Sequence, residues 1–187
     1  MENFINIRLF SNRMLKEITT LSPFFEDPYK IYSAREIARK TGINHITVSK
    51  RLGEFDFIGR EINGPYMGFK AKFTTEFVRL RWIYNMDKLF SSRFIEKAKT
   101  FYDLPTIIVF GSYATATNTK KSDIDIAIIS THKKQMNISE YEKSLGHKIQ
   151  LFLYTKKDIE KMKKDNPELL NSICNGIVLE GELEVFI

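Results

Sequence analysis

Two short apolar segments in the second half of the chain most constrain the fold. Thr106–Phe110 ends at a glycine, Gly111, and Asp123–Ile129 begins with alternating carboxylates. Both segments have the length and the β-branched content of buried strands, and a glycine permits the sharp turn that ends the first one. Because side chains alternate along a strand, Asp123 and Asp125 share one face, and the intervening isoleucines take the other. We therefore expect two strands of one sheet, the second carrying a pair of acids.

The polar residues at these two turns indicate a chemistry. Two carboxylates side by side repel each other unless a cation lies between them, and a hard divalent ion such as Mg²⁺ prefers oxygen ligands. Gly111 and Ser112 open into a predicted helix, where backbone N–H groups can bind phosphate oxygens. Asp123 and Asp125 are thus candidate metal ligands, and the combination favours phosphoryl or nucleotidyl transfer. The alternative is a buried strand that ends in a turn, with two exposed aspartates on a sheet edge.

The spacing of Gly-Ser, ten residues and Asp-Ile-Asp-Ile resembles the signature of the DNA polymerase beta nucleotidyltransferase superfamily, and in particular its minimal nucleotidyltransferase branch. The resemblance covers roughly the C-terminal half of the chain. It implies a small mixed sheet with helices on one face, Mg²⁺ as cofactor, and transfer of NMP from an NTP, expected to be ATP, to an acceptor hydroxyl. It assigns triphosphate binding to Gly111 and Ser112, and metal binding and catalysis to Asp123 and Asp125. The implied acceptor is a protein or nucleic acid, such as the partner toxin of a toxin–antitoxin pair.

One expected residue of that family is missing. Relatives carry a third acid on the next strand, predicted here as His147–Tyr154, and the inward position holds Gln150. An amide can ligate a metal weakly or orient a hydroxyl, but it cannot accept a proton. Loss of a general base lowers a rate by about 10² to 10⁴. The remaining candidates for the general base are a group of the substrate and His147. His147 lies at the start of the predicted strand, however, which favours its interpretation as a surface histidine.

The segment after Gly-Ser also departs from the family. Relatives often carry an arginine and a glycine there, where this chain has Thr115 and Ala116. Lys120 and Lys121 are the nearby residues that could supply positive charge toward phosphates.

The N-terminal part has the pattern of two short helices around a turn. Ser33 and Glu36 form a predicted capping box for a helix over Ala34–Lys40, Gly42 permits a turn, and Asn44 is a plausible N-cap for His45–Leu52. Two strands, Ile58–Ile62 and Phe69–Phe73, are predicted on either side of a turn at residues 63–65.

This order resembles a winged helix-turn-helix over roughly residues 5–75. The resemblance implies double-stranded DNA as a partner, read by donors on the outward face of the second helix. The candidate nucleic-acid-binding residues are His45, Thr47, Lys50 and Arg51. The alternative is a domain that only packs against its neighbour or mediates dimerisation.

The whole chain is therefore predicted to be α+β, with a winged helix-turn-helix domain over 1–75, a helical connector over 76–103 and a nucleotidyltransferase domain over 104–187. The connector is rich in aromatic residues, which indicates that it joins the two domains or supports a homodimer. The first functional hypothesis is a metal-dependent nucleotidyltransferase. The alternative is a DNA-binding transcriptional regulator whose nucleotidyltransferase-like domain is weak or silent.

Net charge, the single cysteine and the absence of a long apolar run limit the classes of function that the chain can have. A formal charge of +6 allows an anionic partner, nucleic acid or nucleotide, or simply a solvated lysine-rich surface. Cys174 is the only cysteine, which excludes a disulfide framework and a thiolate zinc site, and we expect it to pack inertly in a helix. No apolar run approaches the length of a membrane span and the N-terminus lacks a signal-peptide layout, which predicts a cytoplasmic protein without a membrane partner.

Overall fold

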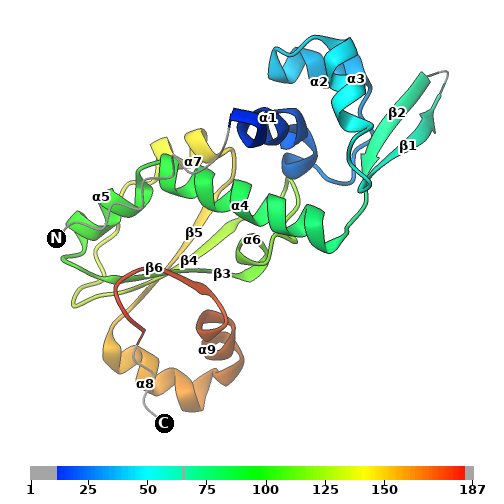
Figure 1. Ribbon diagram of the computed structural model, residues 1–187. Helices are drawn as coiled ribbons and strands as arrows, with labels where there is room; N and C mark the ends of the chain where they lie inside the picture. Colours follow the sequence, from blue (N-terminus) through cyan, green and yellow to red (C-terminus); the bar gives the residue numbers. More distant parts are fainter. Residues whose placement is uncertain (1–11, 65, 184–187) are drawn as a thin grey trace. The chain divides into compact units, whose positions relative to one another are not determined.

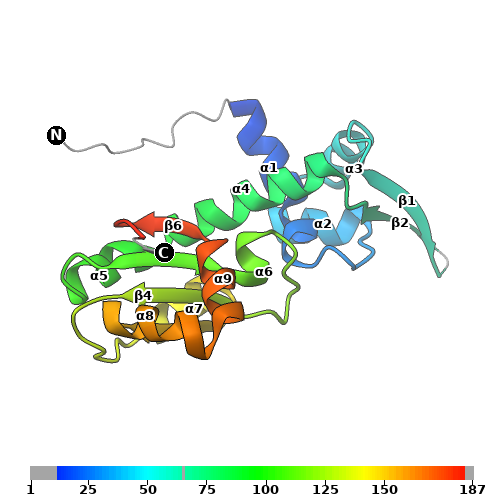
Figure 2. The same cartoon turned by 90° about the horizontal axis from the view of Figure 1, so that it is seen from below.

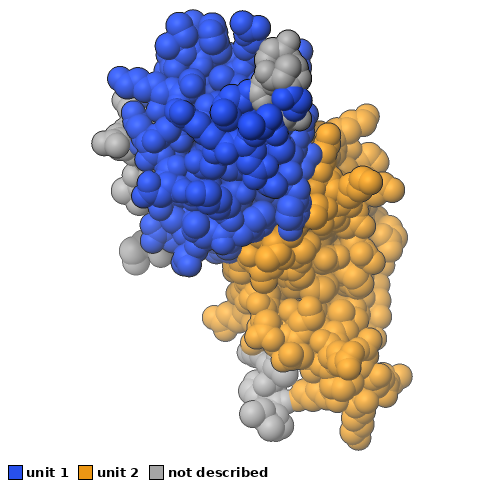
Figure 3. Space-filling view, turned by 90° about the vertical axis from the view of Figure 1, so that its right-hand side faces the viewer, with its two compact units in different colours: residues 1–84 blue, residues 85–187 orange. Residues whose placement is uncertain are grey.

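The computed structural model of the protein describes residues 12–64 and 66–183, and its element order is shown in Figure 1. The chain divides into two compact units, residues 1–84 and residues 85–187 (Figure 3). The longest helix of the described residues, α4 (Thr75–Ser91), contains the boundary between them. The residues predicted as a connector, 76–103, are thus divided between the two units.

In the described residues of unit 1, three helices are followed by a hairpin. The helix α3 has the predicted bounds, and α2 starts where the sequence predicts but ends one residue later, at Thr41 rather than Lys40. Ser33 and Glu36 form the reciprocal capping box of α2, Gly42 ends it with a φ of 73°, and Asn44 caps α3. The bounds are α1 Asn12–Glu26, α2 Ala34–Thr41 and α3 His45–Leu52.

The hairpin of unit 1 is antiparallel and projects beyond the helices (Figure 2). It consists of β1, Ile58–Asn63, and β2, Tyr66–Ala71. The second strand therefore begins three residues earlier than predicted and ends before Phe73, so the predicted bounds Phe69–Phe73 are wrong. The turn is tighter than expected, with Gly64 at a φ of 61°; the predicted turn residue Pro65 lies outside the described residues.

Unit 2 is a four-stranded mixed sheet with helices. The strand order is β5-β4-β3-β6, in which β4 and β5 run parallel and the other two pairings are antiparallel. This confirms the predicted small mixed sheet and its short edge strand. The bounds are α5 Phe94–Phe101, β3 Thr106–Phe110, α6 Gly111–Ala114, β4 Ile124–Ile129, α7 Ser139–Leu145, β5 Ile149–Tyr154, α8 Lys156–Asp165, α9 Pro167–Cys174 and β6 Ile177–Glu180.

Both faces of this sheet are covered, so the expectation of helices on one face is wrong. Ile124, Ile126 and Ile128 of β4 pack with the C-terminal part of α4, with α5 and with α7. Ala127, from the opposite face of the same strand, packs with α8 and α9. Figure 1 shows the two helical layers on either side of the strands. The helices predicted as a connector supply the second layer, because their apolar stripe needs a surface to cover.

The helices test two expectations from the sequence, which concern a membrane span and the packing of Cys174. Among the helices of the described residues, none combines the length and the apolar character that a bilayer crossing requires. Cys174 is the last residue of α9 and is exposed, so the expectation that it packs in a helix interior is wrong.

Candidate active site

The turn after β3 brings a glycine against a carboxylate. Gly111 begins the single-turn helix α6 with a φ of 68°, a conformation that favours glycine. A Cβ atom built on Gly111 would lie 2.5 Å from Oδ2 of Asp125. Strand register explains the approach, because Phe110, the residue before the turn, is the antiparallel partner of Asp125. Residues fourteen positions apart in sequence therefore meet at one end of the sheet.

Asp125 is half-buried and shares its side of β4 with Ala127, which places it on the sheet face that α8 and α9 cover. Burial raises the pKa of the Asp125 carboxyl above its ordinary value, and the negative charge of Asp123 raises it further. Asp123 itself is exposed and directly precedes β4. The predicted alternation is confirmed from Ile124 to Ile128, but the strand begins one residue later than predicted, so Asp123 lies just before it. The two acids are close enough to interact electrostatically.

A rigid turn leads into Asp123. Ser122 accepts a hydrogen bond from the backbone N–H of Thr119 through its hydroxyl, at 2.9 Å. The ring of His147 lies 2.8 Å from the Ser122 carbonyl oxygen through Nδ1. Because a carbonyl oxygen only accepts, we assign the proton of the neutral ring to Nδ1. His147 is half-buried and lies edge-on to the Tyr113 ring, so part of its side chain is at the surface while the ring packs against Tyr113.

Gln150 lies beside Asp125. The two residues are register partners in the parallel pairing of β4 with β5, and Gln150 is exposed on this edge strand. The residue that the resemblance placed at the third acidic position is therefore next to the pair. Among the described residues, no group of three or more histidines, cysteines, aspartates or glutamates is arranged to hold a metal ion. The described donor set consists of two carboxylates with a neighbouring amide.

Hydrogen bonds between backbone groups of the same segment stabilise the fold of residues 111–123. The N–H groups of Thr117 and Asn118 both donate to the Ser112 carbonyl, at 2.9 and 3.1 Å. Ala116 is buried and has a φ of 56°, at a position where relatives often carry glycine. Lys120 and Lys121 are exposed in the turn before the acids.

A buried polar cluster behind this segment has no counterpart in the sequence-based expectations. Asn85 of α4 donates through its amide nitrogen to the carbonyl of Tyr113 and to Oδ1 of Asn118. The signal available in the sequence was an asparagine within the apolar stripe of a helix, since such a residue is normally excluded from a core unless it has partners.

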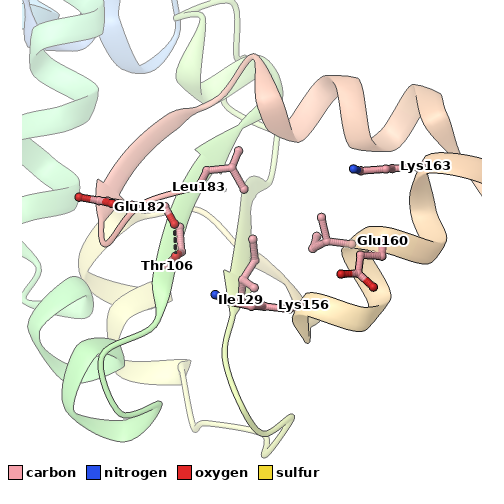
Figure 4. Close-up of a pocket in the computed structure, with 8 residues that line it drawn as sticks. Thr106, Ile129, Lys156, Glu160, Lys163, Glu182 and Leu183 are labelled. Carbon is pink, nitrogen blue, oxygen red and sulfur yellow. Dashed lines mark hydrogen bonds between the residues drawn. The ribbon is translucent and has the colours of Figure 1, made fainter. Parts of the chain in front are cut away.

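A separate hollow of about 130 Å³ lies at the other end of the same sheet (Figure 4). It is lined by the first residue of β3, Thr106, and the last residue of β4, Ile129, together with α8 and Leu183. Phe110 lies four residues after Thr106 along β3, a distance of about 13 Å at the usual rise per residue. This hollow is therefore remote from the carboxylate pair.

The four residues of α3 predicted to contact DNA differ in their exposure and in their contacts. His45 and Lys50 are exposed, and Thr47 is half-buried. Arg51 donates from its guanidinium to Thr20 Oγ1 at 3.1 Å, which ties α3 to α1. Two shallow hollows flank the exposed side of α3, and both include Lys50 and Glu54. The outward face is thus polar but carries an acid as well as bases.

Comparison with known proteins bears on unit 2. Residues 93–182 match the family model described as Polymerase beta, Nucleotidyltransferase. The search of curated proteins found no match. The family match does not extend to α1, α2, α3 or the hairpin, so the winged helix-turn-helix stays a prediction. The matched residues, from α5 to β6, carry the Gly-Ser turn and both acids, and this part of the chain is similar to the nucleotidyltransferase domain that the family model describes.

Proposed function

We propose that this protein is a metal-dependent nucleotidyltransferase that moves NMP from an NTP, with ATP the expected donor, to an acceptor hydroxyl. The acceptor oxygen forms a bond to the α-phosphorus, the bond from that phosphorus to the bridging oxygen breaks, and pyrophosphate leaves. Gly111 and Ser112 bind the phosphates in this proposal, and Asp123 and Asp125 hold Mg²⁺. Because the Gln150 amide cannot accept a proton, the hydroxyl proton passes to a substrate phosphate or to water.

One observation carries the proposal. The Asp125 carboxylate occupies the space that a Cβ of Gly111 would fill, so the predicted phosphate turn and the predicted metal ligand are in contact. The family match over residues 93–182 supports the reaction class.

The carboxylate pair suits a hard divalent cation. The raised pKa of Asp125 has two causes, burial and the charge of Asp123, and a cation between the two groups offsets both. Bound Mg²⁺ would polarise the reacting phosphate and neutralise charge on the pyrophosphate. The register of Gln150 opposite Asp125 supports a role in which its amide adds an oxygen ligand or orients the acceptor hydroxyl. The chain's own part of the chemistry is mostly positioning, which dominates phosphoryl transfer.

The test is release of pyrophosphate from each NTP with Mg²⁺ and candidate acceptors. We expect Asp123→Asn and Asp125→Asn each to lower the rate by at least about 10²-fold, since metal ligands supply several kcal/mol of charge stabilisation. Asp165→Asn, which removes an exposed carboxylate at the end of α8, is the matched control and should retain full activity. Equal rates in the wild type and the two site variants would refute the assignment.

A second function, DNA binding by unit 1, is favoured by the distribution of charge. Residues 1–84 contain 14 lysines and arginines against 9 aspartates and glutamates, so +5 of the net +6 charge falls in this unit. Three helices followed by a hairpin fit a winged helix-turn-helix, with His45 and Lys50 exposed on α3. The readings coexist, because one unit can choose a location while the other performs chemistry.

Duplex binding is tested by titration at several salt concentrations. Lys50→Glu should weaken binding and reduce the salt dependence by about one counterion, whereas Lys161→Glu, an exposed lysine of α8, should do neither. No measurable duplex affinity at low salt would remove this second function. A protein acceptor and a homodimer stay predictions from the sequence.

A further inference from the structure

The loop between Ser112 and Asp123, which we call the motif loop and define as residues 113–122, is hydrogen-bonded to the buried Asn85 of α4. Asn85 is 2% exposed, and its amide nitrogen donates to the Tyr113 carbonyl at 3.2 Å and to Asn118 Oδ1 at 2.9 Å. The Tyr113 hydroxyl in turn donates to the Asn85 carbonyl at 3.2 Å. Asn85 and Tyr113 are thus joined in both directions.

The first of these contacts reaches the Gly-Ser turn. Asn118 is 1% exposed, and its backbone N–H donates to the Ser112 carbonyl at 3.1 Å. A path of hydrogen bonds therefore runs from Asn85 through Asn118 to Ser112, one of the two residues proposed to bind phosphate.

The second contact reaches the acids. Tyr113 is 1% exposed and lies edge-on to His147, with ring centroids 5.9 Å apart. His147 bonds to the carbonyl of Ser122, the residue before Asp123. The Asp123 end of the motif loop is consequently attached to Tyr113, and through it to Asn85.

The loop needs such attachment because its backbone is strained. Ala116 adopts a φ of 56°, a left-handed conformation that brings the alanine Cβ close to its own backbone and is therefore unfavourable. Strained conformations persist only where surrounding contacts determine them. Ala116 is followed by Thr117 and Asn118, which are held on Ser112, and the Asn85 contact falls on the same turn.

Packing alone does not account for an asparagine at this position. A buried amide without partners is costly, and an apolar side chain of similar size would fill the same space at no such cost. The Asn85 amide nitrogen donates to two acceptors of the motif loop, the Tyr113 carbonyl and Asn118 Oδ1. Buried polar groups of this kind fix one arrangement among several that an apolar core would tolerate.

We propose that Asn85 is a positioning residue that holds the motif loop so that Ser112 and Asp123 are pre-arranged for a metal–nucleotide complex. It acts on the Ser112 end through Asn118 and on the Asp123 end through Tyr113. The inference rests on the proposed function, since it names a residue that acts through the proposed phosphate and metal ligands.

The test combines two measurements on the full chain. Hydrogen exchange of residues 113–122 is followed without nucleotide, and the affinity for Mg²⁺ with a non-hydrolysable ATP analogue is measured at equilibrium. Asn85→Leu keeps the side-chain volume and removes the amide, and Tyr113→Phe removes only the hydroxyl. We expect loop exchange about tenfold faster and analogue affinity about tenfold weaker for Asn85→Leu, the size of one or two lost hydrogen bonds, with a smaller change for Tyr113→Phe.

Lys88→Met is the matched control. Lys88 lies one turn further along α4 and donates to the Leu145 carbonyl at the end of α7, away from the motif loop. This variant should lower the thermal stability without changing loop exchange or analogue affinity. A simple structural role for Asn85 would instead lower stability and leave the affinity of the folded protein unchanged.

The experiment distinguishes a failure of the inference about Asn85 from a failure of the proposed function. Unchanged loop exchange in both Asn85→Leu and Tyr113→Phe overturns the inference, as does faster exchange with wild-type analogue affinity. If the wild type binds no metal–nucleotide complex, the proposed function fails, and the inference about positioning fails with it. That result is read from the wild type alone and is therefore distinct from a failure of Asn85.

Discussion

The two units place their candidate residues by different means. In unit 2, the backbone pairing of β3 with β4 sets Phe110 opposite Asp125 and thereby brings Gly111 against the Asp125 carboxylate. In unit 1, the candidate residues lie along one exposed helix, α3, and no pairing fixes which of them face outward. A sheet register is discrete, because a shift of one residue turns every side chain to the other face. A helix surface is continuous, so a neighbouring helix can recruit one of its residues, as α1 does with Arg51.

The largest expected effect comes from completing the acidic set. Gln150→Glu adds a carboxylate beside Asp125 and supplies a group able to accept the hydroxyl proton. We expect the rate of pyrophosphate release to rise by up to about 10²-fold at saturating Mg²⁺. Gln150→Leu should lower it or leave it unchanged. A decrease with Gln150→Glu would mean that this register position does not correspond to the third acid of relatives.

Two glycines with similar backbone angles allow the units to be compared directly. Gly111 and Gly42 have φ values of 68° and 73°, but a Cβ would meet Asp125 at Gly111 and no atom within 4 Å at Gly42. Both Gly→Ala variants should lose about 1 to 2 kcal/mol of unfolding free energy from the left-handed conformation. Only Gly111→Ala should also displace the carboxylate and weaken Mg²⁺–nucleotide binding. Urea unfolding and analogue titration separate the two effects; equal analogue affinities would contradict the proposed phosphate site.

Neighbouring basic residues of α3 test the other half of the comparison. Arg51→Ala removes the hydrogen bond to Thr20 and should cost about 1 kcal/mol of unfolding free energy. Lys50→Ala should leave stability within about 0.5 kcal/mol, because Lys50 is exposed, and should instead lower duplex affinity. Chemical denaturation and duplex titration of both variants are the measurements. If Lys50→Ala destabilises as much as Arg51→Ala, the division into an anchoring and an outward residue is wrong.

The smallest expected effect is a dependence of stability on pH. Burial and then Asp123 raise the pKa of Asp125 in the folded protein. The folded chain therefore holds that proton more tightly than the unfolded chain, and unfolding free energy falls as pH rises from the ordinary aspartate value through the raised one. Without metal, Asp125→Asn should remove this loss and be more stable than the wild type at neutral pH. Urea unfolding from about pH 3 to about pH 7 measures it. If the unfolding free energy of the wild type rises with pH over this range relative to that of Asp125→Asn, the raised pKa of Asp125 is contradicted.

Much of unit 2 follows from its sequence, for reasons that particular residues make clear. Thr106–Phe110 is predicted with the bounds that β3 has, because a glycine and a proline punctuate a β-branched run. The sequence predicts that Asp125, Gln150 and Gly111 belong to one site, from the alternation of side chains, the motif spacing and the family resemblance. Strand pairing in the sheet then brings these residues close together. Asn85 is not predicted, because its partners Tyr113 and Asn118 are separated from it by about thirty residues and no local pattern links them.

Other features that the sequence does not predict have similar physical causes. Helices on both faces of the sheet are not anticipated, because an apolar stripe on α5 does not say which surface it covers. Arg51 follows the outward spacing of Lys50, yet its longer, planar side chain reaches Thr20 on α1. Tertiary contacts of this kind override a helical wheel.

The central claim is that Asp123 and Asp125 hold a divalent cation beside Gly111. Titration of the ¹⁵N-labelled protein with paramagnetic Mn²⁺ tests it without requiring an acceptor or a turnover. The account predicts that the amide resonances of Gly111, Asp123, Asp125 and Gln150 broaden first and together, and that they stay sharp in the Asp123→Asn/Asp125→Asn double variant. Sharp resonances at these positions in the wild type, while other parts of the protein broaden, would contradict it.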